Sequence, residues 1–94
     1  MMPKVEIYSS PLCGYCYMAK KLLKQKNVDF DEINVLGNAG NRTEMTRRSR
    51  HTSVPQIFIN DEHIGGFDDI YALDKSGRLD PLLSGISQRT DNSG

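Results

Sequence analysis

The hydrophobic period changes twice within the first 36 residues of the chain. Residues 4–8 alternate apolar and polar side chains, as a half-buried strand does. From Cys13 to Lys26 the apolar residues instead fall on one helical stripe, and from Phe30 to Leu36 they alternate again. Two strands joined by a helix are predicted to lie parallel, with a right-handed crossover between them.

The second half of the chain predicts an antiparallel hairpin between two helices. Asn41 and Glu44 have the spacing of a capping box, which predicts a helix from Asn41 to about Arg50. Residues 56–59 and 62–64 are apolar and β-rich, and Asn60-Asp61 between them is typical of a tight hairpin turn.

Two further helices are expected after the hairpin. Asp68 and Asp69 open the first of them and Gly77 closes it, whereas Asp80 as N-cap and Pro81 at the first helical position start a short last helix that reaches Ile86. The predicted order is βαβαββα plus a terminal helix. This order predicts an α/β fold with a four-stranded mixed sheet that is flanked by helices on both faces.

Length and charge restrict the possible classes of protein. The 94 residues fit one domain over residues 1–86, and residues 87–94 carry no apolar side chain and are expected to form a flexible tail. A net charge of zero argues against nucleic-acid binding through bulk positive charge. The chain has neither an apolar run of the roughly 18–20 residues that a membrane helix needs nor a secretory signal, so a cytoplasmic protein is expected.

The two cysteines carry the clearest chemical signal. Two are too few for a disulfide scaffold, but Cys13 and Cys16 are three residues apart at the predicted start of the first helix. The unpaired N–H groups and the dipole of a helix N-terminus stabilise a thiolate at Cys13. Cys16 lies one turn further in, on the same side and more buried. The spacing therefore predicts an exposed nucleophile followed by a resolving thiol, with Tyr15 as an aromatic wall beside the sulfur.

Three other interpretations of the cysteine pair compete with this one. Both cysteines could be inert core residues, or they could bind structural zinc together with His51 and His63. The zinc site is disfavoured because these histidines are twelve residues apart and His63 falls in a strand pattern. Half of an iron–sulfur site shared between two molecules remains open.

Two more segments that adjoin predicted strands are candidates for binding a ligand. Ser53-Val54-Pro55 places a proline just before a strand, in a tight turn that can contain a cis peptide bond and leave the Val54 backbone available to a ligand peptide. An ordinary edge-strand proline is the alternative.

The second segment, residues 65–69, places a glycine pair and two carboxylates at a helix N-terminus. Backbone N–H groups there could receive a carboxylate, and Asp68 or Asp69 an ammonium group. The alternative is that these two acids only cap the helix.

Together, the Cys13–Cys16 motif, residues 52–59 and residues 64–69 resemble the glutaredoxins, and most of all the small bacterial dithiol type, here with the variant Cys-Gly-Tyr-Cys. The resemblance covers Val5 to about Leu83. It implies a thioredoxin-like fold and glutathione-dependent thiol–disulfide exchange.

The resemblance also implies roles for individual residues. Cys13 is the nucleophile and Cys16 the resolving thiol. The implied glutathione contacts are Tyr15 at the groove, Ser53, Val54 and cis-Pro55 along the cysteinyl backbone, Gly66, Phe67, Asp68 and Asp69 at the γ-glutamyl end, and Arg42 at the glycine carboxylate.

Two positions depart from the family pattern. Gly14 stands where the family often has proline, and Ser10 stands where it often has a lysine. Without that lysine, thiolate stabilisation depends more on the helix terminus, and carboxylate recognition depends more on Arg42. In this family, non-proline variants sometimes hold a [2Fe–2S] cluster.

The expected function is therefore a glutathione-dependent thiol–disulfide oxidoreductase that reduces protein disulfides and glutathione mixed disulfides. Its expected partners are glutathione, disulfide-containing or glutathionylated proteins and, through glutathione, glutathione reductase. We expect a monomer that has no tightly bound cofactor, no metal site, and neither nucleic acid nor membrane as a partner. The alternatives are a [2Fe–2S] carrier with Cys13 as ligand, and a redoxin that is reduced by thioredoxin reductase.

Overall fold

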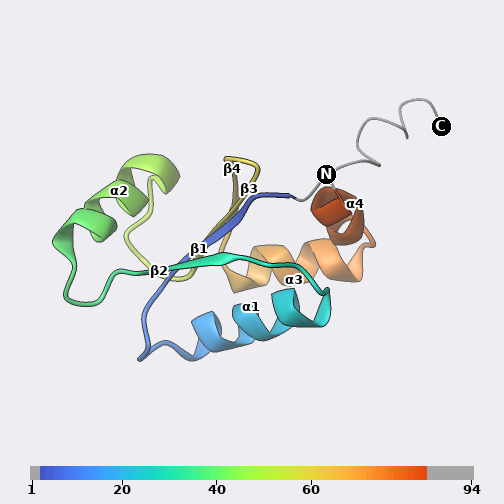
Figure 1. The fold of residues 1–94 in the computed structure, drawn as a ribbon, viewed down its shortest axis with the longest axis horizontal. Coiled ribbons are helices and arrows are strands. Elements are labelled where there is room, and N and C mark those ends of the chain that lie inside the picture. The colour runs from blue at the N-terminus through green and yellow to red at the C-terminus, as the bar shows by residue number, and fades with distance from the viewer. Residues whose placement is uncertain (1–2, 85–94) are drawn as a thin grey trace.

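The computed structural model describes residues 3–84 (Figure 1). The elements are β1 (Val5–Ser9), α1 (Gly14–Gln25), β2 (Asp31–Asn34), α2 (Ala39–Ser49), β3 (Gln56–Ile59), β4 (Glu62–Gly65), α3 (Phe67–Lys75) and α4 (Leu79–Ser84). This order confirms the predicted βαβαββα pattern with a further helix.

The four strands form one mixed sheet in the order β2-β1-β3-β4. β1 and β2 are parallel, as the strand–helix–strand pattern predicted, and β3 lies antiparallel to β1 on its other side. β4 returns antiparallel to β3 through the turn at Asn60 and Asp61, whose φ angles of 52° and 68° are both left-handed. The predicted hairpin and its turn are confirmed.

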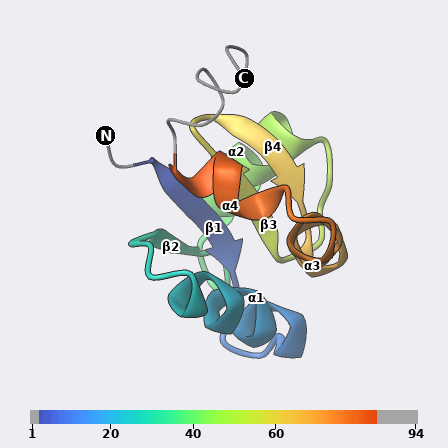
Figure 2. The ribbon, with the colours of Figure 1, turned by 90° about the vertical axis from the view of Figure 1, so that its right-hand side faces the viewer.

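Helices cover both faces of the sheet. α1 and α3 lie side by side on one face, and α2 covers the other (Figures 1 and 2). Successive side chains of β1 point to opposite faces. Ile7 therefore packs into the core under α1 and α3, while Tyr8 packs with Met45 of α2.

Arg48 anchors α2 to the sheet. Its guanidinium donates to Glu6 at 3.0 Å and to the Tyr8 hydroxyl at 2.9 Å, and it lies 4.0 Å from the centre of the Phe58 ring. The Arg48 side chain is only 16% exposed. A guanidinium this buried needs such partners, and these contacts join α2 to β1 and β3.

Several predicted boundaries need correction. α2 begins at Ala39 and not at Asn41, because the Asn38 side chain accepts from the Asn41 N–H at 3.0 Å and is the N-cap. Glu44 pairs with Arg47 instead of closing a capping box. α4 begins at Leu79, so that Asp80 lies in its first turn instead of at its N-cap.

Some predictions concern residues near the chain ends. Ile86 and the expected tail over residues 87–94 lie outside the described residues. Within residues 3–84, every helix is too short or too polar to span a bilayer.

Candidate redox site

Cys13 is the N-cap residue of α1. Its Sγ accepts a hydrogen bond from the Cys16 backbone N–H at 3.2 Å, and its carbonyl accepts from the Tyr17 N–H at 3.2 Å. The same sulfur lies 3.7 Å from the carbonyl oxygen of Val54. The predicted place of Cys13 at a helix N-terminus is confirmed. The Cys16 amide is one of the first-turn N–H groups that have no partner within the helix, and it donates to the Cys13 sulfur instead.

Cys16 lies one turn further along and is fully buried, whereas Cys13 is partly exposed. Burial, followed by the hydrogen bond and the charge of Cys13, raises the pKa of Cys16 to about 12. Both side chains are free thiols. The predicted difference in exposure between the two cysteines is confirmed. In the reduced protein, the raised pKa keeps Cys16 protonated at neutral pH.

The loop from Thr52 to Pro55, which we call the active-site loop, runs from α2 into β3 past Cys13. Its Val54–Pro55 peptide bond is cis. The Thr52 carbonyl accepts from Nη1 of Arg42 at 3.0 Å, and the Ser53 carbonyl accepts from Nε2 of Gln56 at 3.1 Å. Two successive carbonyls of the loop are thus held by side chains, and Val54 follows them next to the Cys13 sulfur.

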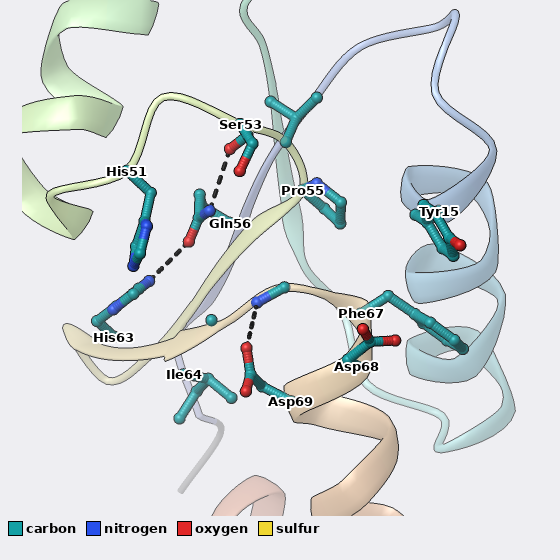
Figure 3. A pocket seen from close by; sticks show the side chains of 13 residues that line it. Tyr15, His51, Ser53, Pro55, Gln56, His63, Ile64, Phe67, Asp68 and Asp69 are labelled. Carbon is teal, nitrogen blue, oxygen red and sulfur yellow. Dashed lines mark hydrogen bonds between the residues drawn. The ribbon is translucent and has the colours of Figure 1, made fainter.

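The N-terminus of α3 closes against the same loop. A Cβ on Gly66 would lie 3.3 Å from the Pro55 carbonyl oxygen, so glycine permits this close approach. Asp69 Oδ2 accepts from the Gly66 N–H at 3.0 Å. Asp69 therefore caps the helix, as the alternative interpretation anticipated, whereas the Asp68 side chain lies exposed at the pocket wall (Figure 3).

A pocket of about 470 Å³ lies between these segments. At one end Tyr15 stacks on Phe67, with ring centroids 6.2 Å apart and planes at 26°. Figure 3 shows the lining side chains converging from α1, the active-site loop, β4 and α3. The residues that line it are Tyr15, His51, Ser53, Val54, Pro55, Gln56, His63, Ile64, Gly65, Gly66, Phe67, Asp68 and Asp69.

The pocket brings together most residues for which the resemblance implied ligand contacts. Arg42 is the exception, because it is not among the lining residues, and its guanidinium donates to the Thr52 carbonyl of the loop. Cys13 lies beside the pocket, at Val54.

Gln56 was not predicted to lie with His51 and His63, the two histidines of the zinc alternative. His51 and His63 lie twelve positions apart, yet their rings are 5.7 Å apart, and His63 Nε2 lies 2.7 Å from Gln56 Oε1. Burial and the neighbouring His51 lower the pKa of His63. The hairpin register could have indicated this contact, since His63 pairs with Phe58 and Gln56 shares the Phe58 face. The zinc alternative gains no support: no group of three or more metal-ligating side chains gathers within residues 3–84.

Comparisons with known proteins agree with this geometry. The family model described as Glutaredoxin matches residues 5–64. The chain is 57% identical over 82 residues to Glutaredoxin 3 of Escherichia coli K12, an alignment that covers 87% of this chain and 99% of that protein.

Two solved structures are similar in fold. The solution structure of glutaredoxin from Brucella melitensis has a TM-score of 0.77 and 48% identity, covering 87% of this chain and 89% of that one. The crystal structure of a buckwheat glutaredoxin–glutathione complex has a TM-score of 0.81 and 27% identity, covering 88% of this chain and 78% of that one. The expected thioredoxin-like fold is confirmed.

Proposed function

This chain belongs to the glutaredoxin family and is a thiol–disulfide oxidoreductase, and we propose that glutathione is the thiol on which its activity depends. The observation that carries the proposal is a single continuous pocket. It joins the Tyr15–Phe67 stack, the active-site loop and the Gly66 end of α3. The Cys13 sulfur lies 3.7 Å from the carbonyl oxygen of Val54, which is one of the lining residues. A tripeptide with one thiol and three charged groups fits such a pocket, because backbone, aromatic and acidic groups are spread along it.

The contacts we propose follow from these positions. Val54 and Pro55, with Ser53 before them, pair with the cysteinyl backbone of glutathione, and Tyr15 forms the wall of the groove. Gly66 and Phe67 offer the N-terminus of α3 to the γ-glutamyl carboxylate.

The charged ends of the ligand need separate partners. Asp68 receives the γ-glutamyl ammonium, and Asp69 contributes its charge while one of its oxygens caps α3. Arg42, exposed on α2, is the proposed partner of the glycine carboxylate.

Reduction of a glutathione mixed disulfide uses Cys13 alone. The Cys13 thiolate attacks the glutathione sulfur, so that a bond forms between these two sulfurs and the protein thiolate leaves and takes up a proton. A second glutathione thiolate then attacks the bound glutathione sulfur. Cys13 is released as a thiolate, and the two glutathione molecules leave as glutathione disulfide. The two glutathione thiols are thereby oxidised, and the client protein is reduced.

Reduction of a protein disulfide also needs Cys16. Attack by Cys13 leaves the client joined to the enzyme through one sulfur. Cys16 then loses its proton to solvent and attacks Cys13, so that a Cys13–Cys16 disulfide forms and the client sulfur leaves as a thiolate that takes up a proton. Two glutathione molecules reduce this disulfide and leave as glutathione disulfide. In the mixed disulfide Cys13 carries no charge, so two of the causes that raise the pKa of Cys16 in the reduced protein are removed. The buried thiol becomes a better nucleophile at the step that needs it.

A pair of coupled assays tests the dependence on glutathione. A glutathionylated peptide is offered with glutathione, glutathione reductase and NADPH, and in parallel with thioredoxin reductase and NADPH. We expect turnover in the first system and little in the second. Turnover only in the second would replace this proposal with a redoxin that is reduced by thioredoxin reductase.

The [2Fe–2S] alternative is tested by the same preparation. Such a cluster is held by four ligands, usually thiolates, and within the described residues the only partly exposed thiol is that of Cys13. Cys13 would hold the cluster, which when bound would supply electron-transfer or cluster-delivery chemistry, and the other ligands would come from glutathione and a second copy. Colourless, monomeric, active protein from anaerobic purification is expected; a coloured dimer without activity would favour the carrier.

A further inference from the structure

A chain of side-chain hydrogen bonds runs from β4 to the active-site loop. His63 Nε2 lies 2.7 Å from Gln56 Oε1, and Gln56 Nε2 donates to the Ser53 carbonyl at 3.1 Å (Figure 3). Gln56 is 4% exposed. A buried amide must satisfy its polar atoms within the protein, so the two ends of Gln56 are committed to His63 and Ser53.

This series of hydrogen bonds fixes the tautomer of the neutral His63 ring. The Gln56 amide donates to Ser53, and therefore its oxygen faces His63 and accepts. His63 must then carry its proton on Nε2, which leaves Nδ1 without one. The His63 ring also packs against the rings of Phe58 and His51, with centroids 5.1 Å and 5.7 Å away, so its orientation is held as well.

The loop is held at two adjacent points. Arg42 binds the Thr52 carbonyl from the α2 side, and Gln56 binds the Ser53 carbonyl from the sheet. Val54 is the next residue, and its backbone is the part of the loop that the proposed function assigns to the ligand. Small rotations at Ser53 would turn the Val54 amide and carbonyl away from the ligand, since the backbone dihedrals are the only soft degrees of freedom between them.

We propose that Gln56 and His63 are positioning residues for ligand recognition: together they hold the Ser53 carbonyl, and through it they fix the direction in which Val54 presents its backbone to glutathione. This inference rests on the proposed use of glutathione. Neither side chain touches the reacting sulfurs, so their loss should act on substrate binding rather than on the sulfur chemistry.

The functional test compares two disulfides of one peptide, one with glutathione and one with cysteine. His63→Leu and Gln56→Leu should each raise KM for the glutathionylated peptide by about two- to tenfold, which is the range for one lost hydrogen bond. The value of kcat should change less. The value of kcat/KM for the cysteinylated peptide should fall less than that for the glutathionylated peptide. The ratio of the two values, which measures the preference for glutathione, should therefore decrease.

Conservative variants separate positioning from general damage. His63→Gln keeps an amide donor near the position of Nε2 and should restore most of the preference. Gln56→Glu keeps an acceptor toward His63 but replaces the donor toward Ser53 by an oxygen, so it should behave like Gln56→Leu. His51→Leu separates the ring contact from the hydrogen bonds, because the His51 ring packs on His63 and lines the pocket without belonging to the series of hydrogen bonds. A smaller loss of preference than in His63→Leu is expected and assigns the effect to the hydrogen bonds, whereas an equal loss assigns it to the ring contact and overturns the inference.

The tautomer gives a test that needs no substrate. Long-range ¹⁵N–¹H NMR of the reduced protein should show His63 protonated on Nε2, and Gln56→Leu should remove the fixed tautomer. A proton on Nδ1 in the wild type overturns the inference. So does a His63→Leu variant with an unchanged preference ratio, even if its melting temperature is lower. A wild-type protein without any preference for the glutathionylated peptide overturns the glutathione proposal itself, so the two failures are distinguishable.

Discussion

The backbone N–H of Cys16 donates a hydrogen bond to the Sγ atom of Cys13 at 3.2 Å. One cysteine thus stabilises negative charge on the other through its amide, while its own thiol is buried beneath. A three-residue spacing at a helix start produces this arrangement, because the N-cap side chain bonds the amide of the third helical residue. The two sulfurs have the same chemistry, and position alone leaves one partly exposed at the helix start and the other buried with a raised pKa.

Cys13→Ser should abolish thiol–disulfide exchange. The hydroxyl of serine does not ionise near neutral pH, and the buried Cys16 cannot replace the exposed sulfur. The glutathione-coupled assay with a glutathionylated peptide should show less than about 1% of wild-type turnover. Activity well above that level would mean that Cys16 is the nucleophile.

Cys16→Ser should affect the reduction of glutathione mixed disulfides much less than the reduction of protein disulfides. It should keep most reduction of the glutathionylated peptide, because that reaction needs one protein thiol and dissolved glutathione. It should lose most reduction of a protein disulfide at low glutathione, because the internal thiol with its high effective concentration is gone. Equal losses in both assays would show instead that Cys16 supports the fold or the reactivity of Cys13, and thermal melting of the variant tells these two apart.

Asp68→Ala and Asp69→Ala should differ in their effects on stability and on kcat/KM. Asp69 caps α3 through the Gly66 N–H, so its removal should lower the free energy of unfolding by about 0.5–2 kcal/mol in denaturant titrations. Asp68 makes no such bond, and its removal should leave stability within about 0.5 kcal/mol of wild type. If Asp68 receives the glutathione ammonium, kcat/KM for the glutathionylated peptide should fall about five- to thirtyfold. The same stability loss and no kinetic loss in both variants would contradict the assigned difference.

The reduced protein should lose stability at alkaline pH through Cys16. A thiol is neutral when protonated, and folding raises the pKa of Cys16 from its ordinary 9.0 to about 12, with burial as the main cause. Its stabilising contribution is complete below about pH 9 and is lost as the pH rises toward 12, because the unfolded chain releases the proton first. Urea unfolding at about pH 8 and 10.5 should show about 1–2 kcal/mol more loss in the wild type than in Cys16→Ala. Parallel losses in both proteins would contradict the raised pKa.

Local sequence determined the order of the elements and several of their ends. Asn27 follows the C-cap of α1 in the left-handed region with φ of 59°, and Asn60-Asp61 forms the hairpin turn as predicted. Cys13 stands at the start of α1, where the helical hydrophobic pattern begins. These features depend on hydrophobic period and on residues that tolerate special backbone angles, and neighbouring residues are enough to set them.

Side-chain competition within a few residues was harder to predict. Asn38, and not Asn41, caps α2, because two nearby asparagines can both serve and the position of the preceding loop decides between them. Asp68 and Asp69 looked equivalent in the sequence. The direction in which each side chain leaves α3 brings Asp69 to the Gly66 N–H and leaves Asp68 without that bond, although both line the pocket.

Only the tertiary structure decided which distant residues meet. Arg42 binds the active-site loop, and Gln56 contacts His63 across the hairpin. These contacts follow from strand register and from the direction of each side chain off the sheet, and one residue of slip would send every side chain of a strand to the other face. The sequence alone determined where the reactive sulfur stands on its helix, because that depends on local backbone geometry. The folded sheet decided what holds the loop that faces this sulfur, because that depends on the packing of segments far apart in the chain.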